Sequence, residues 1–149
     1  MILEIDQSGK LEQLNTSTVV AYSNDEHGVV CITAGAKREI VLSLRPRFKG
    51  TRDLFPFLFS VITFILISKI SPRTIIKIDE EYTGKEKIIK NNLEKLLKKK
   101  SGSKWNGDIR FGLIGKSSPA HQLAWKTHRQ KKIPMGKKLT AAEVLCFCH

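Results

Sequence analysis

The sequence predicts an α/β fold with a mixed five-stranded sheet, in which three antiparallel strands come first and helices then alternate with strands, flanked by helices. Short runs rich in β-branched residues occupy the first third of the chain, and 3.6-residue apolar periodicity marks the second half. One long apolar run lies between them. The expected strands are 1–6, 18–23, 29–33, 73–79 and 108–115. The expected helices are 36–44, 53–70, 85–100, 118–130 and 140–147.

The first strands are expected to form a hairpin. Residues 18–23 (TVVAYS) and 29–33 (VVCIT) are β-branched runs, and the polar segment between them has the composition of a turn. Residues 1–6 form a third short run, and residues 7–10 (QSGK) are expected to turn the chain after it. Whether this run joins the hairpin depends on residues 7–17, which have no clear pattern.

Residues 54–68 (LFPFLFSVITFILIS) are nearly all apolar. A membrane span needs about 20 such residues, and charged residues at both ends make this run shorter. A helix that is apolar all round is normally buried in a core, so a core helix is preferred here to a membrane anchor. Part of so apolar a helix can also pack against a second copy of the chain, which makes a homodimer one alternative.

Helices and strands alternate in the second half, which favours parallel strand pairing. In residues 85–100, apolar side chains share one helical face and lysines fill most of the other. A Ser-Pro pair at 118–119 has the residue types of an N-cap and first helical position. Residues 1–149 are interpreted as one domain, in which 131–149 form a basic linker and a C-terminal helix or tail.

Positive charge is concentrated toward the C-terminus. The formal net charge is +12; residues 85–149 hold sixteen basic and four acidic residues, whereas residues 1–84 are neutral. A charge that serves only solubility need not be segregated, so the asymmetry favours a polyanionic partner, DNA or RNA. The basic residues expected to contact nucleic acid are Lys95, Lys98, Lys99, Lys116, Lys126, Arg129, Lys131 and Lys132.

Two tryptophans, Trp105 and Trp125, lie in this basic part. Aromatic rings among basic side chains can stack on unpaired bases, but a helical tryptophan more often packs into the core, which is the interpretation preferred for Trp125. The segment GKSS at 115–118 lacks the glycine spacing of a nucleotide-binding loop. Lys116 and the helix N-terminus that follows can still contact a backbone phosphate.

Acidic residues mark the ends of the first and fourth expected strands: Asp6 in IDQSG, and Asp79 and Glu80 in IDEE. With the element order, these positions resemble the ribonuclease H-like superfamily of ribonucleases H, Holliday-junction resolvases and integrase cores. The element order covers residues 1–130, and the motif match covers only these acids. The resemblance implies that Asp6, Asp79 and Glu80 are catalytic ligands of Mg²⁺ or Mn²⁺, with His121 as a fourth ligand or a proton carrier in phosphodiester cleavage.

Active members of that superfamily usually carry further acids on the first and last helices. Here the apolar helix offers only Asp53 and the helix 118–130 offers none, so Glu4 or His121 would have to substitute. Acids at strand ends are also common as turn residues and helix N-caps. Two functions therefore stay open: a metal-dependent nuclease or resolvase-like phosphodiesterase, and a non-catalytic nucleic-acid-binding protein that keeps the fold without the chemistry.

Three cysteines, Cys31, Cys146 and Cys148, have no regular spacing. Their odd number, with no signal-peptide pattern, favours a reducing, cytoplasmic compartment. Together with His149 they would make four zinc ligands, but the spacing matches no common zinc pattern. No Ser-His-Asp or Cys-His arrangement can be placed on the expected elements.

Overall fold

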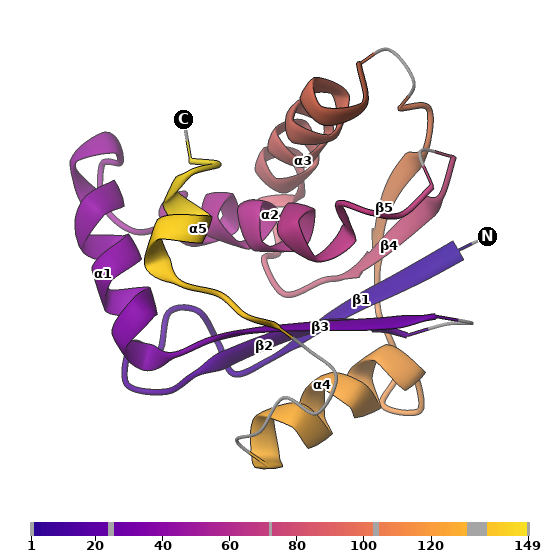
Figure 1. Ribbon diagram of the computed structural model, residues 1–149, viewed down its shortest axis with the longest axis horizontal. Helices are drawn as coiled ribbons and strands as arrows, with labels where there is room; N and C mark the ends of the chain where they lie inside the picture. The colour runs from indigo at the N-terminus through magenta and orange to yellow at the C-terminus, as the bar shows by residue number, and fades with distance from the viewer. Residues whose placement is uncertain (1, 24–25, 72, 103–104, 131–136, 149) are drawn as a thin grey trace.

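The computed structural model describes residues 2–23, 26–71, 73–102, 105–130 and 137–148. A six-stranded mixed sheet has α1, α2, α3 and α5 on one face and α4 on the other (Figure 1). The strands are β1 (Ile2–Ser8), β2 (Thr18–Ser23), β3 (His27–Ile32), β4 (Ile75–Asp79), β5 (Asp108–Gly112) and β6 (Lys137–Lys138). The helices are α1 (Ala34–Leu44), the 3-10 turn η1 (Arg45–Arg47), α2 (Leu54–Ile67), α3 (Glu86–Ser101), α4 (Pro119–Gln130) and α5 (Ala141–Leu145).

The strand order is β5-β4-β1-β2-β3-β6. β1, β2 and β3 pair antiparallel, which confirms the expected hairpin and adds the first run to it as a third strand. β4 pairs parallel with β1, and β5 pairs parallel with β4. The α/β class, the three antiparallel strands at the start and the flanking helices are therefore confirmed, with β1 and β4 side by side near the middle of the sheet.

The expected turn at residues 7–10 was wrong in its first half. Gln7 and Ser8 continue β1, because they pair with Val20 and Val19 of β2. The strand ends at Ser8 and is followed by Gly9, which has a positive φ of 81°. A Cβ at this position would lie 2.4 Å from the backbone oxygen of Ser17, so a close approach of two chain segments requires glycine here.

The sheet has six strands where five were expected. β6 pairs parallel with β3 and lies within the stretch 131–138 that was interpreted as a linker; residues 131–136 fall outside the described residues. Leu139 extends the attachment by donating its backbone N–H to the carbonyl of Cys31 at 2.8 Å. A two-residue strand is too short for an alternating pattern, so its partner strand rather than its own sequence determines it.

The apolar run forms α2, and most of its side chains are buried. α2 packs against α3 and against β2 and β3, which confirms the interpretation as a core helix. None of the helices in the described part of the chain combines the length and apolar character that crossing a membrane requires. The homodimer suggested by the composition of this helix stays a prediction.

Alternation along β1 separates two environments. Leu3 and Ile5 face the large core shared with α2 and α3, whereas Glu4 and Asp6 face α4, because successive side chains of a strand point to opposite faces. α4 packs mainly on β1 and β2. Its face of the sheet has a smaller apolar cluster of Val19, Ala21, Val29 and Ala124, so polar groups make up much of the contact between β1 and α4.

Candidate metal and nucleic-acid site

Two aspartates meet on neighbouring strands. The parallel register pairs Ile5 of β1 with Ile78 of β4, so Asp6 and Asp79 occupy the next position on each strand and point to the same face. Oxygen atoms from Asp6, Asp79 and Glu81 all lie within 4.8 Å of one another. The sequence-based pairing of Asp6 with Asp79 is therefore present in space.

The third carboxylate of this cluster is Glu81, not the expected Glu80. β4 ends at Asp79, and the backbone N–H of Glu81 donates to the Asp79 carbonyl at 2.9 Å in a tight turn. The turn brings the Glu81 carboxylate close to Asp79, whereas Glu80 stays outside the cluster, although both glutamates are exposed. This turn decides which glutamate joins the cluster, and no local sequence pattern specifies it.

α4 contributes His121, whose Nδ1 lies 2.7 Å from Oδ2 of Asp6. The other oxygen, Oδ1, accepts the backbone N–H of Gln7 at 2.8 Å. The Asp6 side chain is only 3% exposed, so these two bonds fix its orientation. His121 is outside the three-carboxylate group that the described residues form, which favours an orienting or proton-carrying role over direct ligation.

Other polar residues of β1 also bond to α4 or to the residue before it. Ser118 donates its hydroxyl to Glu4 at 3.0 Å, and Ser8 Oγ lies 3.2 Å from Nδ1 of His128. Glu4 therefore serves at the start of α4, where a carboxylate is favoured by the helix dipole, and does not complete the acidic cluster. Asp53, the other candidate acid, is instead paired with Lys85 at 2.7 Å.

Two carboxyl groups of the cluster have raised pKa values. Burial raises the pKa of Asp6, the hydrogen bond to His121 opposes this, and the neighbouring Asp79 raises the pKa further. Burial also raises the pKa of Glu81, against the hydrogen bond with Gln7, and both aspartates add to the increase. Carboxylates held this close repel one another, and a cation between them removes the repulsion.

The donor set fits a hard divalent cation. Mg²⁺ and Mn²⁺ prefer carboxylate oxygen, and two or three carboxylates are a common protein contribution to such sites. The backbone N–H of Ile114 donates to Oδ1 of Asp79 at 2.8 Å, so each aspartate is held from outside the cluster. Asp6, Asp79 and Glu81 can therefore hold such an ion.

Two basic side chains missed by the sequence reasoning share this face of the sheet. The register Glu4–Lys77–Arg110 runs across β1, β4 and β5, so Lys77 and Arg110 point to the same side as the acids. A Cβ on Gly112 would lie 3.1 Å from Cε of Lys77, so the lysine side chain extends toward the end of β4 where Asp79 lies. Lys77 precedes Asp79 by two residues in the expected strand, and this spacing could have predicted that both side chains share one face of the sheet.

The expected basic residues do not form one surface. Lys95, Lys98 and Lys99 lie on α3, on the opposite face of the sheet from α4 (Figure 1). They come nine to thirteen residues after the first residue of that helix, which places them roughly 14–20 Å from its start along the helix axis. Lys116, Lys126 and Arg129 are exposed and lie on or just before α4. Lys131 and Lys132 lie outside the described residues.

The two tryptophans differ in environment. Trp105 is buried, but Trp125 is 48% exposed, so the preference for a core position was wrong for Trp125. Arg129 lies over its ring, 5.0 Å from the centroid. Trp125 and Arg129 line a hollow of about 930 Å³ together with His128 and Lys138. The Trp125 side chain lies outside the core because Ala124 and Thr127 occupy the buried face of α4.

The cysteines do not gather. Cys31 is half-buried, Cys146 exposed and Cys148 buried, and among the described residues the acidic cluster is the one group of three or more His, Cys, Asp or Glu side chains close enough to share an ion. His149, the fourth residue of the suggested zinc set, lies outside the described residues.

A scan against protein-family models finds no match for this chain, and a search of curated proteins finds no similar sequence.

Proposed function

We propose that this protein is a nucleic-acid-binding phosphodiesterase of the nuclease or resolvase type that depends on Mg²⁺ or Mn²⁺. The observation that carries the proposal is the convergence of Asp6, Asp79 and Glu81 within 4.8 Å in a chain with a net charge of +12. An acidic cluster in a basic protein suits a substrate whose backbone is a polyanion and whose cleavage needs a cation.

The arrangement of the sheet supports a ribonuclease H-like fold for the proposal. Three antiparallel strands precede the first helix, and β4 lies parallel beside β1. The resemblance expects an aspartate on the central first strand and a second carboxylate at the end of the fourth, and Asp6 and Asp79 occupy these places. Glu81 supplies a third carboxylate where the helices supply none.

Each site residue has a separate role in the proposal. Asp6, Asp79 and Glu81 hold the cation, which supplies charge stabilisation and an activated water when it is bound. His121 fixes the Asp6 carboxylate through Nδ1, and its ring is 33% exposed. The exposed part of the ring can exchange a proton with solvent or with the oxygen that leaves. Lys77 lies near the end of β4 as a positive partner for a phosphate.

The substrate path runs along α4. Lys116 precedes this helix, two residues after the Ile114 that bonds to Asp79. Lys126 and Arg129 follow on the exposed side of the helix. Trp125 is four residues beyond His121, or roughly 6 Å along the helix axis, a spacing comparable to that between neighbouring nucleotides in an extended strand. An unpaired base stacked on Trp125 would therefore place its backbone near the cluster. The α3 lysines are too distant for this path.

A non-catalytic nucleic-acid-binding protein is the second candidate. It is favoured by the absence of any acid on α4 and by the bond that already engages Asp6 with His121. In that case Trp125 and the α4 cations bind the nucleic acid, and the carboxylates serve only the local structure.

The test compares adjacent glutamates. Titration calorimetry with Mn²⁺ should show binding to the wild type and to Glu80→Gln, and strongly weakened binding to Glu81→Gln and Asp6→Asn. At an ion concentration 100 times Kd, binding adds about 2.7 kcal/mol to the free energy of unfolding of the wild type. The midpoint of its thermal unfolding should therefore rise by roughly 5–11 °C. Equal binding by all four proteins would refute the metal site.

Cleavage separates the two candidate functions. Branched, hybrid and single-stranded substrates should be cut by the wild type with Mn²⁺ and not by Asp6→Asn. If the wild type binds these substrates in a salt-dependent manner but cuts none, the non-catalytic function is the correct one.

A further inference from the structure

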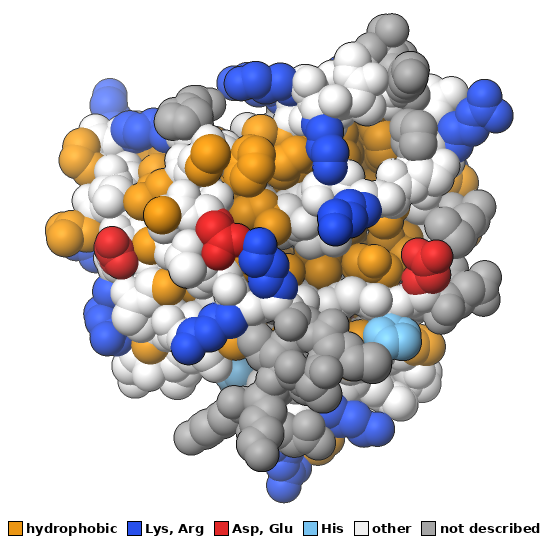
Figure 2. Space-filling model, viewed as in Figure 1, with side chains coloured by type: hydrophobic (Ala, Val, Ile, Leu, Met, Phe, Trp, Pro, Cys, Tyr) orange, Lys and Arg blue, Asp and Glu red, His pale blue; other side chains and the backbone are white. Residues whose placement is uncertain are grey.

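A groove on the face opposite α4 is not used by the proposed function. It lies between α2, α3 and α5 and has a volume of about 670 Å³. On this side of the molecule, apolar side chains lie exposed between lysines and arginines (Figure 2). Pockets of this volume are typical for small molecules, and apolar lining with a few charged groups is their usual composition.

The floor of the groove is apolar. It is lined by Phe64 and Ile65 of α2, by Leu96 of α3, and by Phe147, which follows α5. The Phe64 and Phe147 rings meet edge to face with centroids 5.2 Å apart, so the second ring is held in place although it is 39% exposed. Exposed apolar surface in a hollow gains free energy when a ligand covers it.

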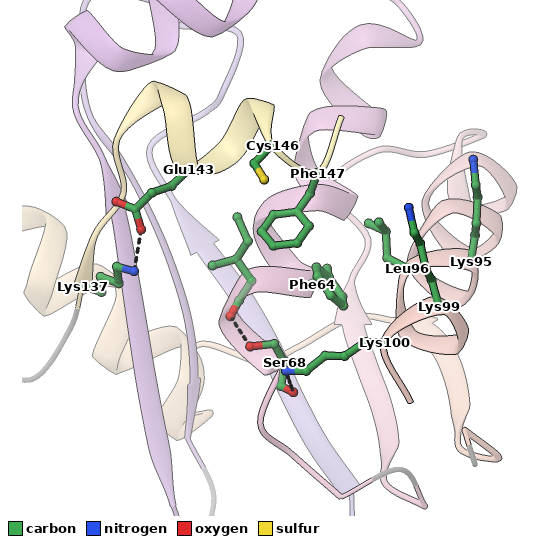
Figure 3. A pocket seen from close by; sticks show the side chains of 11 residues that line it. Phe64, Ser68, Lys95, Leu96, Lys99, Lys100, Lys137, Glu143, Cys146 and Phe147 are labelled. Carbon is green, nitrogen blue, oxygen red and sulfur yellow. Dashed lines mark hydrogen bonds and ion pairs between the residues drawn. The ribbon is translucent and has the colours of Figure 1, made fainter. Parts of the chain in front are cut away.

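The rim is positive on one side. Lys95 and Lys99 extend from α3 beside the two phenylalanines (Figure 3), and within the described part of the chain neither forms an ion pair. Glu143, the one carboxylate of the lining, is neutralised by Lys137 and also caps α5. Lys100 donates to the Ser68 carbonyl and helps to close the end of the groove.

We propose that this groove binds a single-chain anionic amphiphile of the fatty-acid type, with the chain on Ile65 and Phe147 and the carboxylate between Lys95 and Lys99. An apolar floor beside two cations complements a ligand with an apolar chain and one anionic end. Helices bound the groove on three sides, which suits a single chain; a helical peptide, about 10–12 Å across with its side chains, needs a longer open trough. This inference is independent of the acidic cluster.

The experiment is titration of the full chain with dodecanoate below its micelle concentration. The wild type should bind it at a single site, and Lys95→Gln/Lys99→Gln should bind roughly tenfold more weakly, as expected for loss of two partly exposed ion pairs. Lys98→Gln is the matched control, because Lys98 is on the same helix but does not line the groove. It should bind like the wild type.

Two further probes test the apolar half. Decanoate, two methylenes shorter, should bind roughly tenfold more weakly than dodecanoate, because each buried methylene contributes to transfer from water. Phe147→Ser should weaken both. Equal weakening by Lys98→Gln, or no dependence on chain length, would show non-specific attraction to a basic protein and overturn the proposal. So would binding of anionic phospholipid vesicles or an acidic amphipathic peptide through the same residues without binding of dodecanoate.

Discussion

Lys37 is buried in the interior and holds the loop between β1 and β2. Its side chain is 0% exposed. The ammonium donates to the carbonyls of Lys10 at 3.2 Å and Gln13 at 2.6 Å, and to Thr18 Oγ at 3.1 Å. A lysine ammonium has three donors, so each has one acceptor. Lys37→Met should keep the apolar stem and remove all three bonds.

The expected loss follows from which acceptors can reach water afterwards. Lys10 and Gln13 are exposed residues, whereas Thr18 is buried, so their carbonyls can be hydrated if the loop shifts but the hydroxyl stays dry. A buried group left without its partner costs about 1–3 kcal/mol. Lys37→Met should therefore lower the free energy of unfolding by about 2–3 kcal/mol, and the midpoint by roughly 5–10 °C.

Urea unfolding followed by circular dichroism measures this loss. Lys98→Met is the control, because it makes the same change at an exposed position of α3 and should change the free energy by less than about 0.5 kcal/mol. Hydrogen exchange in residues 10–18 should accelerate in Lys37→Met alone. If the two variants are equally stable, the three bonds do not hold the loop as inferred.

The pH dependence gives a second measure of the same residue. Burial lowers the pKa of Lys37 to about 8 from 10.5. The unfolded chain then keeps the proton up to about 10.5 and the folded chain only to about 8, so the unfolded state binds more protons between these values and stability rises with pH across that window. The difference corresponds to roughly 3 kcal/mol. Relative to Lys37→Met, the wild type should gain stability between pH 8 and 10.5, and a flat difference would contradict the burial of a charged ammonium.

The remaining predictions concern the acidic cluster and α4. Because the folded-state pKa of Asp6 is raised, the metal-free protein should lose stability as pH rises from the ordinary carboxyl range through that pKa; Asp6→Asn should flatten this part of the pH–stability profile, and added Mn²⁺ should restore stability to the wild type only. Ser118→Ala should cost about 1 kcal/mol in urea unfolding, because it removes the bond to Glu4 at 3.0 Å. Trp125→Ala should change stability by less than about 1 kcal/mol yet weaken single-strand binding, whereas the buried Trp105→Ala should cost about 3–5 kcal/mol; the opposite order of stabilities would contradict the assigned environments.

Local patterns sufficed for most elements of the fold. β-Branched runs located β2 and β3, and the apolar run located α2 between charged residues. α3 was recognisable because Ile89, Leu93 and Leu97 recur on its buried face. The errors fell where a partner strand decides the structure: β1 runs past Asp6 because β2 pairs with it, and β6 exists only through β3. Such pairings depend on contacts distant in sequence, which no local pattern contains.

The sequence predicted the two aspartates of the candidate site but not its third carboxylate. Asp6 and Asp79 follow from two adjacent strand ends, but the choice between Glu80 and Glu81 depends on a turn whose geometry only the structure shows. The contact between His121 and Asp6 needs the position of α4 over β1. The sequence of α4 shows which of its faces is apolar, but it does not show that this face packs on Val19 and Ala21 of β2.

The charge asymmetry along the sequence has a different meaning in space. The lysine-rich α3 and the basic α4 are on opposite faces of the sheet (Figure 1), so a single straight duplex cannot contact both without wrapping the molecule. If nucleic acid binds only along α4, the salt dependence of binding should reflect the few cations there, such as Lys116, Lys126 and Arg129, rather than the full +12. Neutralising Lys95 and Lys99 should then leave the slope of log K against log salt unchanged. A reduced slope would instead require a path around both faces, and would place nucleic acid over the apolar groove.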